Sequence, residues 1–187
     1  MPITPSAHDR SFIAYPMGLD PQFEKCLPDT LVQEGGYSND AHDPGGMTME
    51  GIIQREYDLK RRQWGEPTQW VKKISPDEMR TIYYTDYWLP YCPQLPHGLD
   101  LEFFDLCVNG GAHRAVVTLQ RALGVTDDGV FGPATSAAVK AADLHHLITT
   151  FCADREAFYR SLSTFRYFGT DWIRRSEEIE KEAEGMA

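Results

Sequence analysis

The chain has 187 residues and a formal net charge of −10, with 42% hydrophobic and 12% aromatic residues. This length fits one domain or a domain and a half, and the composition is that of a globular protein whose core needs no disulfide staples. The negative charge argues against nucleic acid or an anionic membrane as the main partner. No stretch approaches the roughly 20 apolar residues of a membrane span, so we expect no membrane insertion.

The first 20 residues contain three prolines and little periodicity, which predicts an N-terminal arm. Docking onto the body and binding a partner are both open roles for this arm. It has neither the basic start nor the apolar run of a signal peptide, which predicts a protein made in the cytoplasm without one.

Four cysteines are present, and none forms a CxxC pair or a zinc spacing with histidine. We therefore expect four free, mostly buried thiols, and neither a metal nor a cofactor. The cysteines are Cys26, Cys92, Cys107 and Cys152.

The first predicted helix covers residues 21–34, with a restart at Pro28. Phe23, Leu27, Leu31 and Glu34 lie on one face, so Glu34 continues an apolar stripe before two glycines end the helix. Glu34 is either a helix-end carboxylate that points to water or a functional acid.

Residues 37–48 have no helical period and predict loops or a short hairpin. Asp43 follows Glu34 by nine positions, and Thr48 follows Asp43 by five. Hydrolysis of a glycosidic bond needs a protonated carboxyl group for the leaving oxygen and a second group that places water. An apolar helix face would raise the pKa of Glu34 and keep it protonated. The hypothesis from spacing is an acid–base site formed by Glu34, Asp43 and Thr48.

Helices are further predicted over residues 49–64, from Ser75 to about Trp88, and over 99–109, the last as a central buried helix. Four more follow at residues 115–124, 134–142, 144–162 and 171–184. The fold class is therefore mainly α, with roughly eight helices and at most a small β-hairpin near residues 36–48. Asp105 and Asn109 share one face of the central helix, where they either tie the core to a loop or line a cleft.

Four blocks of the chain resemble glycoside hydrolase family 108 lysozymes, which are N-acetylmuramidases of phage and bacterial origin. The blocks are EGGYSNDAHDPGGMTMEGI, IYYTDYWLPY, FFDLCVNGG and LQRALGVTDDGVFGPATSAAV. The later half resembles the peptidoglycan-binding region usually fused behind that domain. The similarity covers roughly residues 23 to 175.

The resemblance implies a lysozyme-like fold and cleavage of the β-1,4 bond between N-acetylmuramic acid and N-acetylglucosamine. It implies Glu34 as general acid, with Asp43 and Thr48 orienting the water. Aromatic faces stack on sugar rings and polar groups bind their hydroxyls. The predicted substrate-binding residues are Tyr37, Asn39, Asp40, Tyr84, Tyr87, Trp88 and Asn109. The expected organisation is an arm (residues 1–20), a catalytic part (21–95) and a helical peptidoglycan-binding part (96–187) packed on it as one body.

Two alternatives remain open. A non-catalytic wall-binding or virion structural module would keep the fold, and Gly51-Ile52-Ile53 in place of the family's usual Gly-Ile-Thr favours it, as does the acidic charge. A lytic transglycosylase is the enzymatic alternative. The expected partner is the glycan strand of peptidoglycan, reached in the periplasm, at the cell wall or from a virion. Release by a holin, delivery by a phage tail and a dedicated secretion system are all open routes.

Overall fold

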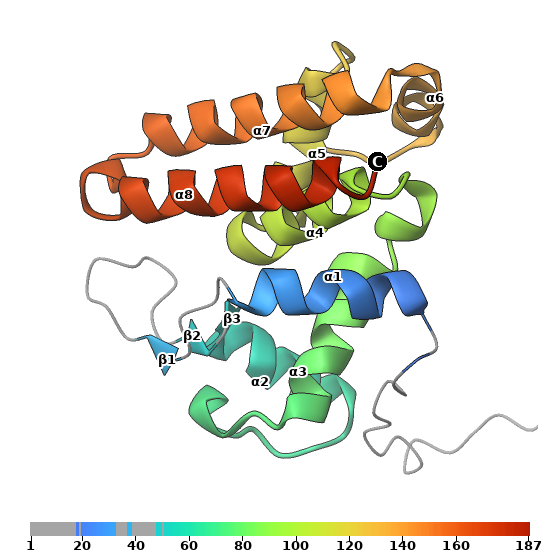
Figure 1. Cartoon of the computed structure of the whole chain (residues 1–187). Helices are drawn as coiled ribbons and strands as arrows, with labels where there is room; N and C mark the ends of the chain where they lie inside the picture. Colours follow the sequence, from blue (N-terminus) through green and yellow to red (C-terminus); the bar gives the residue numbers. More distant parts are fainter. Residues whose placement is uncertain (1–17, 19, 33–36, 39–47, 50) are drawn as a thin grey trace, which may run out of the picture.

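The computed structural model describes residues 18, 20–32, 37–38, 48–49 and 51–187 (Figure 1), with only the backbone of Val32, Tyr37, Ser38 and Thr48. Eight α-helices and one small sheet make up this part of the chain, which confirms the mainly α fold. The helices are α1 (Pro21–Val32), α2 (Gln54–Gln63), α3 (Pro76–Ile82), α4 (Leu99–Gly110), α5 (Ala112–Ala122), α6 (Pro133–Ala141), α7 (Leu144–Ser161) and α8 (Phe165–Glu184).

Helix α1 runs without a break from Pro21 to Val32, so the predicted restart at Pro28 is wrong. A proline in a helix interior removes one backbone hydrogen bond to the carbonyl four residues earlier. Burial of Phe23, Cys26 and Leu27 on the inner face offsets this loss. Burial of this face therefore keeps the helix continuous through Pro28, and a rule based on local sequence does not detect such tertiary burial.

The β-structure is a three-stranded antiparallel sheet of two-residue strands, in the order β1 (Tyr37–Ser38), β2 (Thr48–Met49) and β3 (Ile52–Ile53). The predicted start of the second helix near Met49 is wrong, because α2 begins only at Gln54. Gly51 in the β2–β3 connection has φ +78°, a left-handed conformation that glycine adopts without strain. The two β-branched residues that follow then pair with Thr48 and Met49.

Helix α3 begins at a capping box, as predicted. The Ser75 side chain accepts from the backbone N–H of Glu78, while the Glu78 side chain accepts from the backbone N–H of Ser75. From Tyr83 to Trp88 the helix widens to a π-helix, η2, in which Leu89 N–H donates to Tyr84 O at 2.8 Å. The one-residue insertion rotates the aromatic positions relative to an α-helix.

Helix α4 lies at the centre of the molecule. It packs against α1, η2 and the 3₁₀-helix η3 (Cys92–Gln94), and also against α5, α7 and α8 (Figure 1). Every residue from Leu99 to Val108 is buried, which confirms the predicted central helix. Helices α7 and α8 lie side by side along one edge of the structure, while α2, α3 and the sheet lie on the other side of α1.

Candidate functional site

The predicted acid Glu34 lies outside the described residues, as do Asn39, Asp40 and Asp43. In sequence, Glu34 stands between the end of α1 at Val32 and the start of β1 at Tyr37. The other three residues stand between Ser38 and Thr48. The described elements around them therefore define the frame of the site.

The sheet brings the two ends of this frame together. Ser38 of β1 pairs with Thr48 of β2, and Tyr37 pairs with Met49. Thr48 pairs in turn with Ile53 of β3, which leads directly into α2. The sheet thus places the backbone of the predicted water-positioning Thr48 beside the strand that follows Glu34 in sequence.

Tyr87, a predicted sugar contact, is a residue of η2 whose side chain reaches α2. Its hydroxyl donates to Glu56 Oε2 at 3.1 Å. Burial raises the pKa of Tyr87 well above its usual range, and the neighbouring carboxylate of Glu56 adds to the effect. Tyr87 therefore stays protonated and holds Glu56, which lies in the first turn of α2, against η2.

Trp88 is a core residue in this structure. It is 1% exposed, and its indole Nε1–H donates to Asp20 Oδ2 at 2.8 Å. Its ring packs against Phe23 and Phe104 at centroid distances of 5.6 and 5.4 Å. Tyr84 packs edge-on against the same Phe23 at 5.1 Å and is half-buried. A ring with no exposed face offers nothing to a sugar, so Trp88 is left out of the substrate contacts proposed below.

Asn109 is exposed at the end of α4, where its Oδ1 accepts from the Tyr159 hydroxyl at 3.4 Å. One turn earlier, Asp105 is fully buried between two arginines. Arg175 Nη2 of α8 donates to Asp105 Oδ1 at 2.6 Å, and Arg155 of α7 donates to Asp105 Oδ2. The side of α4 that carries Asp105 is thus tied to α7 and α8 by buried charge.

The pKa values of Asp105 and Glu102 move in opposite directions, although both side chains are fully buried on α4. For Asp105, burial favours the neutral form, but Arg175 and Arg155 prevail and lower the pKa below its usual value. For Glu102, burial prevails and raises the pKa to about 8, although Arg155 Nη1 lies 3.3 Å from its Oε2. Within the described residues, Glu102 Oε1 has no hydrogen-bond partner. The cluster therefore holds one carboxylate and one carboxylic acid at neutral pH.

The side chains of α2 and α3 are joined by a second buried network. The Tyr57 hydroxyl donates to Glu78 Oε2 at 3.0 Å, and Arg61 donates to Glu78 Oε1. Lys60 Nζ of α2 forms an ion pair with Asp86 Oδ1 of η2 at 2.5 Å. These contacts fix α2, the helix that directly follows the sheet, against α3 and η2.

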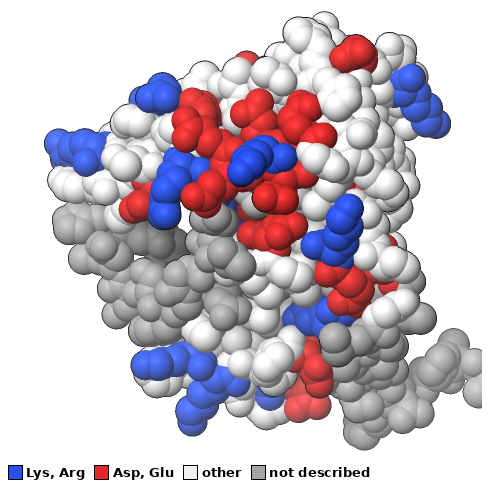
Figure 2. Space-filling model, viewed as in Figure 1, with Lys and Arg blue, Asp and Glu red and all other residues white. Residues whose placement is uncertain are grey.

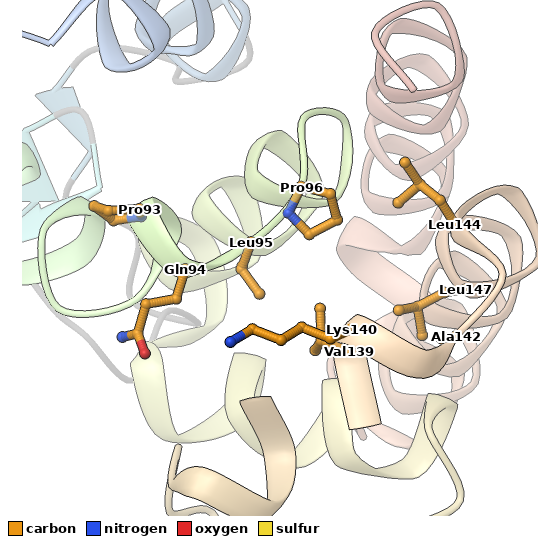
Figure 3. Close-up of a pocket in the computed structure, with 9 residues that line it drawn as sticks. All are labelled: Pro93, Gln94, Leu95, Pro96, Val139, Lys140, Ala142, Leu144 and Leu147. Atoms are coloured by element: carbon orange, nitrogen blue, oxygen red, sulfur yellow. The ribbon is translucent and has the colours of Figure 1, made fainter. Parts of the chain in front are cut away.

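The hollows in the described surface include two that are lined by residues of the later half of the chain. One, of about 350 Å³, lies between η3 and the start of α7, and Figure 3 shows Lys140 extending across it toward Gln94. The other, of about 540 Å³, lies where α7 ends and α8 begins. Three arginines and one carboxylate line it, with apolar surface from two further side chains: Arg160, Arg166, Arg174, Glu177, Phe165 and Ile173.

Among the described residues, no group of three or more His, Cys, Asp or Glu side chains is placed to hold a metal ion. All four cysteines are buried and free, as predicted. No described helix has both the length and the apolar character needed to cross a membrane.

Comparison with known families and solved structures identifies the class of protein. The glycosyl hydrolase 108 family model matches residues 27–111, and a predicted peptidoglycan domain matches residues 114–177. Among solved structures, the chain is similar to the structure of Brucella abortus SagA. The identity is 32% and the TM-score 0.77, over 87% of this chain and 94% of that chain. No curated protein matches the chain. The chain belongs to the glycosyl hydrolase 108 family, whose members are glycoside hydrolases that act on peptidoglycan.

Several residues with prominent contacts in the structure were not predicted from the sequence. Arg155 and Arg175 bind Asp105 from positions 50 and 70 residues away. Gln54 and Trp70, which lie next to the sheet, were not predicted either. The signal for Trp70 was its sequence context, because a tryptophan between a Gly-Glu-Pro turn and two lysines is a poor core residue.

Proposed function

We propose that the protein is a muramidase that cleaves the β-1,4 bond between N-acetylmuramic acid and N-acetylglucosamine, with Glu34 as the general acid. The match of the glycosyl hydrolase 108 family to residues 27–111 carries this proposal, because it includes the Glu-Gly-Gly-Tyr block and everything up to the end of α4. In this proposal Glu34 protonates the leaving oxygen.

Asp43 and Thr48 are proposed to orient the attacking water on the opposite face of the sugar, with inversion at the anomeric carbon. The pairing of Thr48 with Ser38 supports this role, since it keeps the end of the 39–47 segment beside β1. Tyr37, Asn39, Asp40 and Asn109 are proposed substrate contacts, together with Tyr84 and Tyr87, whose rings are half-buried.

The later helices are proposed to hold the glycan strand while the earlier part cuts it, as one body divided at about residue 95. The match to a predicted peptidoglycan domain over residues 114–177 supports this role. The hollow at the α7–α8 turn is the proposed contact, because arginine guanidinium groups bind carboxylates in a bidentate geometry. Peptidoglycan carries such carboxylates on its peptides.

The test compares wild type with Glu34→Gln on purified sacculi, following turbidity and new reducing ends. Glu182→Gln, an exposed carboxylate of α8, serves as the control for charge. We expect reducing ends from wild type and the control, and none from Glu34→Gln with its melting temperature unchanged. Lysis by Glu34→Gln at the wild-type rate would refute the assignment of the acid.

Product analysis separates the remaining alternatives. An anhydro ring at the new chain end would identify a lytic transglycosylase. Pelleting of both proteins with sacculi, without any release of sugar, would identify a binding or structural module.

A further inference from the structure

Trp70 is an exposed aromatic residue next to the sheet. It is 46% exposed and directly precedes the 3₁₀-helix η1 (Val71–Lys73), which packs against β2. Strand β2 contains Thr48, so the indole belongs to the same corner of the molecule as the proposed catalytic frame. The exposed part of the indole ring offers apolar surface to a ligand.

The backbone around Trp70 is held on both sides by one side chain. Gln54 Nε2 donates to Gln69 O at 2.8 Å, and Val71 N–H donates to Gln54 Oε1 at 2.7 Å. Gln54 is the first residue of α2 and directly follows β3. The Gln54 amide therefore couples the backbone on both sides of Trp70 to the end of the sheet, in addition to the packing of η1 on β2.

Neighbouring side chains complete this support. Val71 is fully buried, while Gln69 Nε2 donates to the Tyr57 hydroxyl at 2.9 Å and to Lys73 O at 2.9 Å. A ring on a backbone fixed at both neighbours loses little freedom when a ligand stacks on it, which favours binding. The backbone that carries Trp70 is thus fixed before any ligand binds.

A cation accompanies the ring. Lys72 Nζ lies 5.6 Å from the centroid of the Trp70 ring, within the range of a cation–π contact. Lys73, which follows Lys72, is also exposed. So is Arg55, which follows Gln54. Figure 2 shows a group of Lys and Arg at the lower left that is separate from the acidic group at the upper centre. In a chain of net charge −10, the two adjacent exposed lysines Lys72 and Lys73 make the start of η1 locally basic.

We propose that Trp70 stacks on a sugar ring of the glycan strand and that Lys72 binds a carboxylate of the peptide attached to it. This inference rests on the proposed function and adds two residues that contact its peptide-bearing substrate. The faces of pyranose rings are apolar C–H surfaces that fit an indole. The lysine ammonium next to the ring supplies the charge that a carboxylate requires.

The experiment measures KM and kcat on two substrates: glycan strands with their peptides, and the same strands after an amidase has removed the peptides. For Trp70→Ala we expect KM to rise about tenfold on both substrates with kcat unchanged, and Trp70→Phe to recover part of the loss. For Lys72→Met we expect KM to rise about threefold on peptide-bearing strands only, and the difference to disappear in high salt.

Two variants serve as matched controls. Leu59→Ala removes another exposed apolar side chain, 53% exposed on α2, and Lys25→Met removes an exposed lysine of α1. Neither should change KM. Equal losses in Leu59→Ala and Trp70→Ala would overturn the proposal, because stacking at one place would not explain them.

A binding measurement separates this proposal from the proposed function. Calorimetry of intact strands with the Glu34→Gln protein, with and without Trp70→Ala, reports stacking without turnover. Unchanged binding and KM in Trp70→Ala, with cleavage intact in wild type, would refute the role of Trp70 and leave the muramidase assignment standing. Weaker binding in Trp70→Ala, with no cleavage by wild type, would support Trp70 and refute the muramidase.

Discussion

Asp105 and Glu102 provide a direct test of the buried charge cluster, because two carboxyl groups on one helix should respond oppositely to amidation. Asp105→Asn removes the negative charge between Arg155 and Arg175 and leaves two cations buried without it. Breaking a buried ion pair by removing one partner costs about 3–5 kcal/mol of unfolding free energy. For a chain of this size that loss corresponds to a fall in melting temperature of roughly 10 °C.

Glu102→Gln should behave differently, because Gln resembles the protonated acid that the folded protein already holds at neutral pH. The pKa of Glu102 rises from its ordinary 4.5 to about 8 on folding. The folded state therefore binds a proton more tightly, and the resulting stability is complete below pH 4.5 and is lost as the pH rises to 8. The whole change amounts to roughly 4–5 kcal/mol at 1.36 kcal/mol per pH unit. Glu102→Gln should remove this decline.

The assay is urea unfolding of wild type and both variants between pH 4.5 and 9. We expect Asp105→Asn to be less stable than wild type across the range. Glu102→Gln should come closest to wild type at pH 4.5 and gain on it steadily up to pH 8. An equal loss at every pH in both variants would refute the different protonation of the two groups. A flat wild-type profile would refute the raised pKa of Glu102.

Three further changes test local features. Ser75→Ala removes the capping box that joins Ser75 and Glu78, and should cost about 1 kcal/mol in urea unfolding. Gln120→Leu removes an amide that donates to three groups of residues 128–135 and accepts from the backbone N–H of Gly129. We expect the unfolding free energy to fall by about 2 kcal/mol. Limited proteolysis should be faster within residues 128–135 and unchanged elsewhere. Gly98→Ala combines φ +89° with a Cβ 2.5 Å from Ala183 O, so it should lower the melting temperature markedly, whereas Gly124→Ala, strained but in open space, should cost less.

Local sequence rules were sufficient where one residue type determines the structure. The Ser-Pro-Asp-Glu start of α3 and the buried central helix α4 were both predicted, because a helix cap and a helix dense in apolar residues leave strong local signals. The rules failed at Ile52-Ile53, where a short apolar run fits a strand or a helix equally well and the pairing partner decides. They failed at Pro28 because tertiary burial outweighed one lost hydrogen bond.

The candidate site shows the same division. The resemblance of the blocks predicted the family, which the comparisons confirm. The individual aromatic contacts were harder to predict, since a π-turn changes which of Tyr83, Tyr84, Tyr87 and Trp88 faces the core. No local pattern marks Arg155 and Arg175 as partners of Asp105, because the contact exists only after the later helices dock on α4. The roles of Glu34, Asp43 and Thr48 stay predictions.

The charge cluster also constrains how this architecture evolves. Helix α4 falls within the first matched segment, while Arg155 and Arg175 fall within the second. Recombination between the two segments would leave a buried carboxylate on one product and buried guanidinium groups on the other, each too costly to survive unless both sides change together. We therefore expect the two matched segments to change together during evolution. New cell-wall preferences should arise by substitution on the outer faces of α7 and α8, and not by exchange of whole binding modules.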